Sequence, residues 1–152
     1  MRISAKTDYA VRAAVELAGA TDGEPVTGER IADAQAIPLR FLENILGQLR
    51  QAGLVASRRG AEGGYWLAPP AGEIAIADVI RAIDGPLANV NGTRPEGLEY
   101  GGSAEPLREV WVAVRASVRT VLEQVTLADV VEGRLPPEVA RLTKASGAWD
   151  PH

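Results

Sequence analysis

Residues 38–68 read PLRFLENILGQLRQAGLVASRRGAEGGYWLA, and this stretch decides the fold class. Its apolar residues first recur every three or four positions, which predicts a helix that begins at Pro38 and stops before Gly53. Two short runs rich in apolar and aromatic residues follow, Leu54–Ser57 and Tyr65–Ala68, with three glycines between them. Glycine adopts the positive φ angles that a tight hairpin needs. The stretch therefore predicts a helix followed by a β-hairpin.

Two more helices are predicted before this stretch. Ser4 can cap a helix that reaches about Ala20, and Thr27 can cap a short helix that reaches about Gln35. Only a tight connection separates the second helix from the third. Three helices followed by a hairpin make a winged helix-turn-helix domain, which we expect to span residues 1–70.

After this domain, apolar spacing predicts a short helix that ends at Gly85. Residues 86–104 have no hydrophobic period, and a stretch of this length is usually either functional or disordered. We therefore expect a short helix and a sensor-like loop over residues 71–104. Residues 134–152 are expected to form a flexible tail, in which Trp149 is the one residue that could dock.

Residues 105–133 predict a long helix and a short final helix capped by Thr126. Apolar side chains of the long helix alternate spacings of four and three, as in the seam of a helix pair. The seam could pack on its own domain or against the same helix of a second chain. We favour the second alternative, since a winged domain is too small to cover the helix. The expected dimer residues are Leu107, Trp111, Val114, Val118, Val121, Leu122 and Val125.

The helix of residues 38–52 has one face that suits DNA. Opposite its apolar side lie Arg40, Asn44, Gly47, Gln48 and Gln51, flanked by Phe41 and Glu43. Arginine and amide side chains can pair bidentately with guanine and adenine edges in the major groove. The second helix of a helix-turn-helix is the one that enters this groove. The alternative is an ordinary solvated face, in which Glu43 forms an ion pair with Arg40 or Arg50.

The hairpin tip is a second candidate surface for DNA. Arg58 and Arg59 stand beside its glycines, where arginine can contact phosphate or enter a narrow minor groove; the alternative is a solvated turn. The first helix could add phosphate contacts, or be merely a solvated terminus. The candidate DNA-binding residues are Arg2, Lys6, Tyr9, Thr27, Pro38, Arg40, Phe41, Glu43, Asn44, Gln48, Arg58, Arg59, Gly60, Gly63 and Gly64.

Composition limits the function further. The chain has no cysteine, and its one histidine is the last residue, His152. Disulfides, thiol redox switches, cysteine-ligated zinc and ordinary iron–sulfur ligation are therefore excluded. No catalytic motif is present, so we expect neither an enzyme nor a cofactor or metal. No signal peptide or membrane span is predicted, which indicates a cytoplasmic protein.

The net charge of −4 is unusual for a DNA-binding protein. Residues 1–66 hold eight Lys/Arg and eight Asp/Glu, whereas residues 67–152 hold eight and twelve. The excess of acidic residues thus lies in the second half, and the first half can still present a basic face. A DNA-binding regulator is the leading hypothesis. The alternative is a winged-helix module that binds protein and no DNA, which the acidic charge favours.

Four segments together resemble the Rrf2 family of winged-helix regulators. They read MRISAKTDYAVRAAVELA, PLRFLENILGQLRQAGLVASRRGAEGGYWLA, IADVIRAIDGPL and LREVWVAVRASVRTVLEQVTLADV, and the similarity extends in order from Met1 to about Val131. The resemblance implies homodimers on palindromic promoter sites and, usually, repression. It also implies DNA contacts by Pro38, Arg40, Phe41, Glu43, Asn44 and the wing residues Arg59, Gly60, Gly63 and Gly64.

The chain departs from the cluster-bearing members of that family. Their loop before the dimer helix supplies three cysteines, whereas residues 86–104 here contain none. The carboxylates Glu96, Glu99 and Glu105 are poor ligands for a soft iron–sulfur centre. The chain therefore resembles the cluster-free CymR branch, which implies a role in sulfur or cysteine metabolism. The loop, with Arg94 and Tyr100, could bind a small-molecule effector or a partner protein, or could be a disordered remnant.

Overall fold

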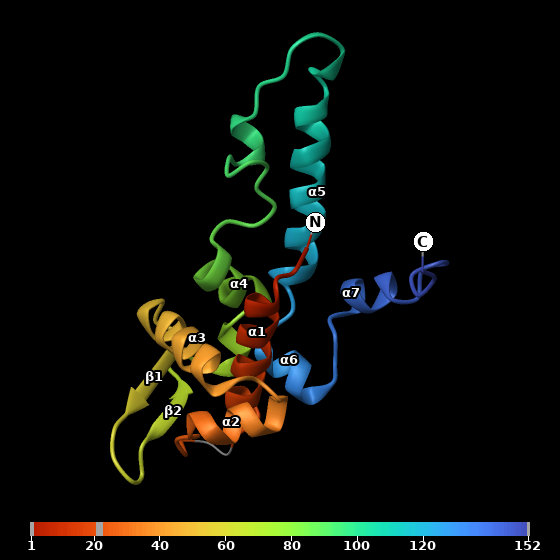
Figure 1. Cartoon of the computed structure of the whole chain (residues 1–152). Helices are drawn as coiled ribbons and strands as arrows, with labels where there is room; N and C mark the ends of the chain where they lie inside the picture. Colours follow the sequence, from red (N-terminus) through yellow and green to blue (C-terminus); the bar gives the residue numbers. More distant parts are fainter. Residues whose placement is uncertain (1, 21–22, 152) are drawn as a thin grey trace.

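The computed structural model describes residues 2–20 and 23–151, and it confirms the expected fold class. The described chain is mainly helical and holds one antiparallel β-hairpin (Figure 1). Its elements are α1 (Ala5–Ala18), α2 (Gly28–Gln35), α3 (Leu39–Gln51), β1 (Val55–Arg58), β2 (Gly64–Leu67), the 3₁₀ turn η1 (Ala71–Glu73), α4 (Ile76–Asp84), the 3₁₀ turns η2 (Pro95–Gly97) and η3 (Gly102–Ala104), α5 (Leu107–Leu122), α6 (Leu127–Glu132) and α7 (Pro137–Leu142).

The two N-terminal helix caps that the sequence predicts are present, at the starts of α1 and α2. The Ser4 hydroxyl accepts from the Thr7 amide at 3.1 Å, and the Thr27 hydroxyl accepts from the Arg30 amide at 3.3 Å. The turn between α2 and α3 contains Ala36 in the left-handed region, at φ 51°. Pro38 differs from the expectation: it precedes the first helical residue, and its carbonyl accepts the first bond of α3.

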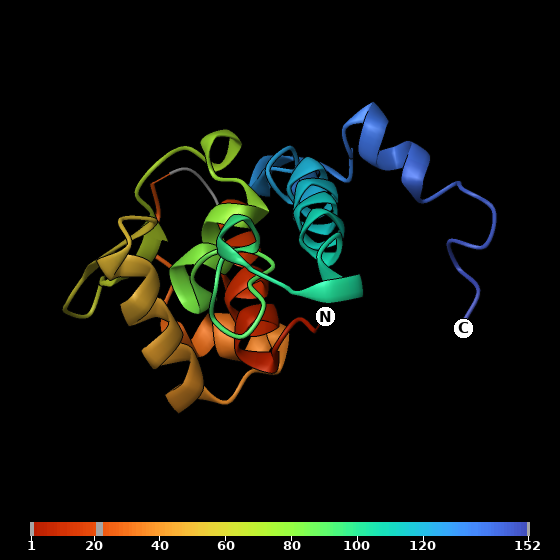
Figure 2. The same cartoon turned by 90° about the horizontal axis from the view of Figure 1, so that it is seen from above.

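The core forms where α3 and α4 both pack on α1 (Figures 1 and 2). Alanines on α1 let the neighbouring backbones approach closely, while α3 contributes the larger side chains. The buried residues of these two helices are Thr7, Ala10, Ala13, Ala14, Leu17, Leu42, Ile45, Leu46 and Leu49. Among them only Thr7 is polar, and its hydroxyl donates to the Asp84 carboxylate at the end of α4. Helix α3 is therefore fixed by its apolar side to α1 and α4.

The wing is larger than the predicted hairpin. Strands β1 and β2 pair from Val55↔Leu67 to Arg58↔Gly64. Val26, just before α2, adds a bridge: its amide and carbonyl both bond to Tyr65 at 2.8 Å. Gly64 permits this approach, because it has φ +150° and a Cβ there would lie 2.7 Å from the Val26 carbonyl oxygen. The bridge ties the wing to the start of α2.

Residues 86–104 and α5 project from the body as an arm (Figure 1). The loop follows one side of α5 through η2 and η3, and a bridge between Val90 and Thr93 folds its first part. Pro95 is buried, and the Glu96 carboxylate forms an ion pair with Arg115 of α5. The loop thus packs along the helix instead of hanging free.

The apolar seam of α5 turns toward its own chain. Val118 and Leu122 pack against the buried residues of α4 and Leu87, and no residue of α5 is fully buried. Val125, beyond the helix, is 6% exposed and its carbonyl accepts from the Ile76 amide. The chain itself therefore covers part of the surface that the sequence assigned to a dimer.

The C-terminal segment holds more structure than the expected tail. Thr126 caps α6 as predicted, with its hydroxyl 3.1 Å from the Asp129 amide. After it, Pro137–Leu142 form α7, which the sequence did not predict. The Trp149 indole N–H donates to the Thr143 carbonyl at 2.6 Å, although the side chain is 83% exposed. No described helix has both the length and the apolar character that crossing a membrane requires.

Candidate nucleic-acid interface

The two faces of α3 separate as the sequence predicted. Leu42, Ile45, Leu46 and Leu49 are buried, and the opposite face is open to solvent. Phe41 is 64% exposed at the start of the helix, so its ring is accessible to a partner. One turn further along, the Gln48 amide donates to the Asn44 side-chain oxygen at 3.1 Å. The open face thus presents one aromatic ring and a linked pair of amides.

A groove of about 420 Å³ separates the start of α2, the side of α3 and the wing. It brings together seven of the predicted DNA-binding residues: Thr27, Glu43, Arg58, Arg59, Gly60, Gly63 and Gly64. They come from three segments that lie far apart in the sequence. Packing of the chain's own core does not require polar residues and glycines from three segments to meet at one groove.

Five residues of the groove are not among the predicted DNA-binding residues: Gly28, Glu29, Arg50, Ser57 and Tyr65. The Arg50 guanidinium donates to the Ser57 hydroxyl at 3.0 Å and so joins α3 to β1. Arg50 had been considered only as an ion-pair partner for Glu43, and among the described residues Glu43 forms no ion pair. Glu43 and Arg50 are seven residues apart on α3, which is about two helical turns. This spacing indicates that both side chains lie on the same side of the helix.

The two wing arginines differ in their freedom. The Arg58 guanidinium donates to the Glu62 carbonyl at 3.2 Å, which holds it against the wing. Arg59 is exposed and has no hydrogen bond or ion pair with the residues that the structure describes. Gly63 shapes the tip, since a Cβ there would lie 2.2 Å from the Arg58 carbonyl oxygen. Arg59 is thus the wing cation that can reach outward.

The remaining candidates lie elsewhere. Arg2 and Lys6 are exposed at the start of α1, which both views place away from the wing (Figures 1 and 2). Tyr9 is half-buried, and its ring lies 4.9 Å below the guanidinium carbon of Arg12. Arg12 in turn donates to the Gln35 carbonyl at 2.7 Å, so this pair holds α1 against α2.

The charged residues of the groove form no ion pairs with one another in the described chain. Arg50, Arg58 and Arg59 line the groove together with two carboxylates, Glu29 and Glu43. None of these five groups forms an ion pair within the described chain. Of the ion pairs that the described residues do form, only Arg12–Asp8 lies in the winged domain. The cations of the groove therefore remain free for an anionic partner, despite the net charge of −4.

The residues of the arm do not fit an iron–sulfur cluster. The whole chain has no cysteine, so it cannot provide the thiolates that such clusters require. Of the carboxylates in this region, Glu96 is already paired with Arg115. Within the described residues, no group of three histidine or acidic side chains is placed to hold a metal ion.

The sequence has close relatives among regulators of transcription. It is 55% identical to an HTH-type transcriptional regulator of Mycobacterium tuberculosis H37Rv over 142 residues, which is 93% of this chain and 88% of the relative. It is 37% identical to the HTH-type transcriptional regulator IscR of Yersinia pestis, over 92% of this chain and 85% of the relative.

Solved structures agree with these relatives. CymR, the global cysteine regulator of B. subtilis, matches with a TM-score of 0.75 and 34% identity, over 88% of this chain and 98% of that one. IscR of T. potens matches with a TM-score of 0.71 and 34% identity, over 88% of each chain. The Rrf2 family, described as an iron-dependent transcriptional regulator, matches residues 3–133. This chain therefore belongs to the Rrf2 family of transcriptional regulators.

Proposed function

We propose that this protein is a cytoplasmic, sequence-specific DNA-binding repressor that acts as a homodimer on palindromic promoter sites, without an iron–sulfur cluster. The observation that carries the proposal is the groove between α3 and the wing, which is lined by three arginines that form no ion pair among the described residues. The helix that forms one side of this groove also carries the amide pair of Asn44 and Gln48. Phosphate and base edges are the partners that such a surface suits. Family membership supports the same function.

Each part of this surface has its own role in the proposal. The start of α3 enters the major groove, where Arg40 suits guanine and Asn44 and Gln48 suit adenine. Arg59 at the wing contacts phosphate or the adjacent minor groove. Arg58 donates a hydrogen bond to the Glu62 carbonyl, and Arg50 donates one to the Ser57 hydroxyl. These two arginines set the shape and charge of the groove between the start of α3 and Arg59.

The arm is the proposed dimer contact. The seam residues of α5 remain half-buried against their own chain, and the other side of the helix is open. Val110 is 51% exposed and lies beside the seam, one helical turn before Val114. A second copy of α5 would bury this side chain together with the exposed parts of the seam. A two-fold pair would then present two recognition helices, as palindromic sites require.

A role in sulfur metabolism is the narrowest part of the proposal. It is supported by the structural likeness to CymR. The absence of cysteine from the whole chain favours regulation through a bound partner or metabolite instead of a cluster.

Selection from random DNA duplexes tests the proposal. The purified chain is mixed with a pool of random duplexes, and the retained sequences are read. We expect a two-fold symmetric motif whose half-sites lie about one helical turn apart. If nothing is enriched, either alone or with cell extract added, the protein is a winged-helix module that does not bind DNA.

The substitution Arg59→Ala then tests the wing on the selected site. We expect weaker binding to all sequences and a salt dependence whose logarithmic slope falls by about one, as for loss of one phosphate contact. Arg141→Ala is the control, because Arg141 is exposed on α7, away from the groove and from the proposed dimer helix. Equal losses from the two variants would contradict a specific role for Arg59.

A further inference from the structure

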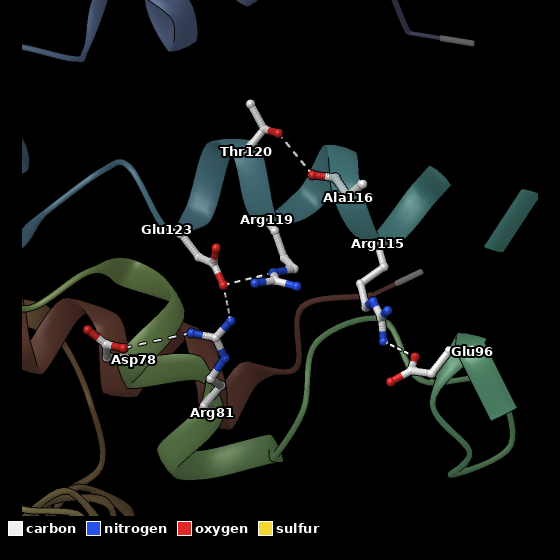
Figure 3. A network of polar contacts seen from close by, with 8 residues as sticks. All are labelled: Asp78, Arg81, Glu96, Arg115, Ala116, Arg119, Thr120 and Glu123. Carbon is white, nitrogen blue, oxygen red and sulfur yellow. Dashed lines mark hydrogen bonds and ion pairs between the residues drawn. The ribbon is translucent and has the colours of Figure 1, made fainter. Parts of the chain in front are cut away.

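A second cleft lies on the opposite side of the core from the wing, where α4, the start of the loop and α5 meet. It has a volume of about 400 Å³. Four arginines line it, Arg81, Arg94, Arg115 and Arg119, together with the carboxylate Glu96. Figure 3 shows Arg81 of α4 and Arg119 of α5 meeting at Glu123, while Arg115 of α5 is turned toward Glu96. The proposed contacts with DNA use none of them.

Carboxylates satisfy only part of this positive charge. Arg81 and Arg119 share Glu123, with 2.9 Å from the Arg119 Nε to the carboxylate (Figure 3). Arg81 also lies 3.8 Å from Asp78, and Arg115 pairs with Glu96. Hydrogen bonds from Arg81 and Arg119 lower the pKa of Glu123, so this carboxylate is charged at neutral pH.

Arg94 is the unmatched member of the group. It is exposed at the edge of the cleft and forms no ion pair with any residue that the structure describes. Each guanidinium offers five N–H donors, so four of them have far more donors than three carboxylates can use. A chain with a net charge of −4 has thus gathered a quarter of its sixteen basic residues around one cleft. The four guanidinium charges exceed the three nearby carboxylates, which leaves a positive charge at this cleft.

We propose that this cleft binds a small anion with several negative charges, a metabolite that carries phosphate or carboxylate groups, as an effector of the regulator. Arginine is suited to both groups, since its planar fork matches their oxygens in pairs. The volume of the cleft suits a molecule of metabolite size. The regulatory part of this inference rests on the proposed function in DNA binding, while the binding part does not.

The position of the cleft connects it to the recognition helix. Arg81 lies on α4, which packs on both α1 and α3. Three residues later, Asp84 accepts a hydrogen bond from the buried Thr7 of α1. The same anion would touch Arg115 and Arg119 on the proposed dimer helix. An occupant can therefore change the placement of α4 and α5 relative to each other, which sets the spacing of two recognition helices.

Calorimetric titration of the full chain tests binding without DNA. Pyrophosphate and citrate are the probes, one for phosphate and one for carboxylate chemistry. We expect saturation at one anion per chain by at least one probe, and about tenfold weaker binding in Arg94→Gln. Arg141→Gln removes the same charge from an exposed site on α7, outside the cleft, and should bind as the parent does. Absence of binding by both probes, or equal losses in the two variants, overturns the site.

A second titration tests regulation. The affinity for the selected DNA site is compared with and without a binding probe, with potassium chloride used to match ionic strength, because phosphate contacts respond to salt alone. We expect a change of at least threefold that Arg94→Gln abolishes. An unchanged affinity overturns the effector role while the anion site stands. A chain that binds anions but no DNA refutes the proposed function instead.

Discussion

Gly47 is the residue whose presence in α3 is least explained by the fold. It lies in the middle of the helix, and a Cβ there would meet no atom within 4 Å. Glycine inside a helix is less stable than alanine by about 0.5–1 kcal/mol. Because the chain has room for a side chain at this position, packing within the chain does not explain the glycine. A glycine here would instead allow a binding partner to approach the helix closely. The face on which it lies is the one proposed to enter DNA.

We therefore predict that Gly47→Ala has two opposite effects. The free energy of unfolding should rise by about 0.5–1 kcal/mol, as urea denaturation followed by circular dichroism would show. Affinity for the selected site should fall, because the new methyl group lies between the helix and the DNA; gel-shift titration measures this. Gly72→Ala, which also adds a Cβ in open space but away from α3, is the control. Unchanged affinity in Gly47→Ala would show that this face does not approach DNA closely.

At the scale of elements, the wing depends on the bridge between Val26 and β2. Gly64 makes the bridge possible, and an alanine there would combine an unfavourable φ with a contact of 2.7 Å to the Val26 carbonyl oxygen. We predict that Gly64→Ala lowers the free energy of unfolding by about 1–3 kcal/mol and weakens DNA binding. The same denaturation and gel-shift experiments apply. The sign of the stability change should be opposite to that of Gly47→Ala, and a neutral result would mean that the bridge adds nothing.

The bridge also shows where sequence reasoning ends. The hairpin was predictable because two apolar runs flank a glycine-rich turn, and the caps at Ser4, Thr27 and Thr126 were predictable from residue type. Val26 contributes a single residue to the sheet, and one residue carries no alternation that a pattern search can detect. Arg50 reaches the groove only because the helix and β1 meet in space.

The arm gives a second example. Apolar spacing correctly identified a helix over α5 and the side of it that packs, but spacing does not say what covers that side. The answer depends on residues 86–104, whose 3₁₀ turns lack a hydrophobic period. Similarly, α7 begins at Pro137, the second of two consecutive prolines within the segment that was expected to be a flexible tail. Proline at the first position of a helix was the signal available.

At the scale of the whole molecule, the structure separates the groove of the winged domain from an arm on which Val110 is exposed. We predict that Val110→Arg converts the proposed dimer to a monomer, because a charge would have to be buried in the contact. Light scattering after size exclusion measures the mass. Binding to a palindromic site should weaken more than binding to a half-site, since only the former gains from two linked helices.

A matched control separates the arm from the tail. Leu142 on α7 is 53% exposed, close to the value for Val110, so Leu142→Arg places the same charge at an equally open apolar site. We expect this variant to remain dimeric. If Leu142→Arg dissociates the protein and Val110→Arg does not, the dimer forms through the C-terminal segment.

The distribution of tryptophan has a practical consequence. Trp66 lies in the wing, Trp111 on the arm and Trp149 in the C-terminal segment, and the chain contains no other tryptophan. Their surroundings differ: Trp149 is 83% exposed, whereas the Trp111 indole nitrogen is buried without a hydrogen-bond acceptor among the described residues. Replacing two of the three by phenylalanine leaves a protein that fluoresces from one chosen region. Light emission can thus report separately on contact with DNA, occupancy near the arm and movement of the tail, without any attached dye.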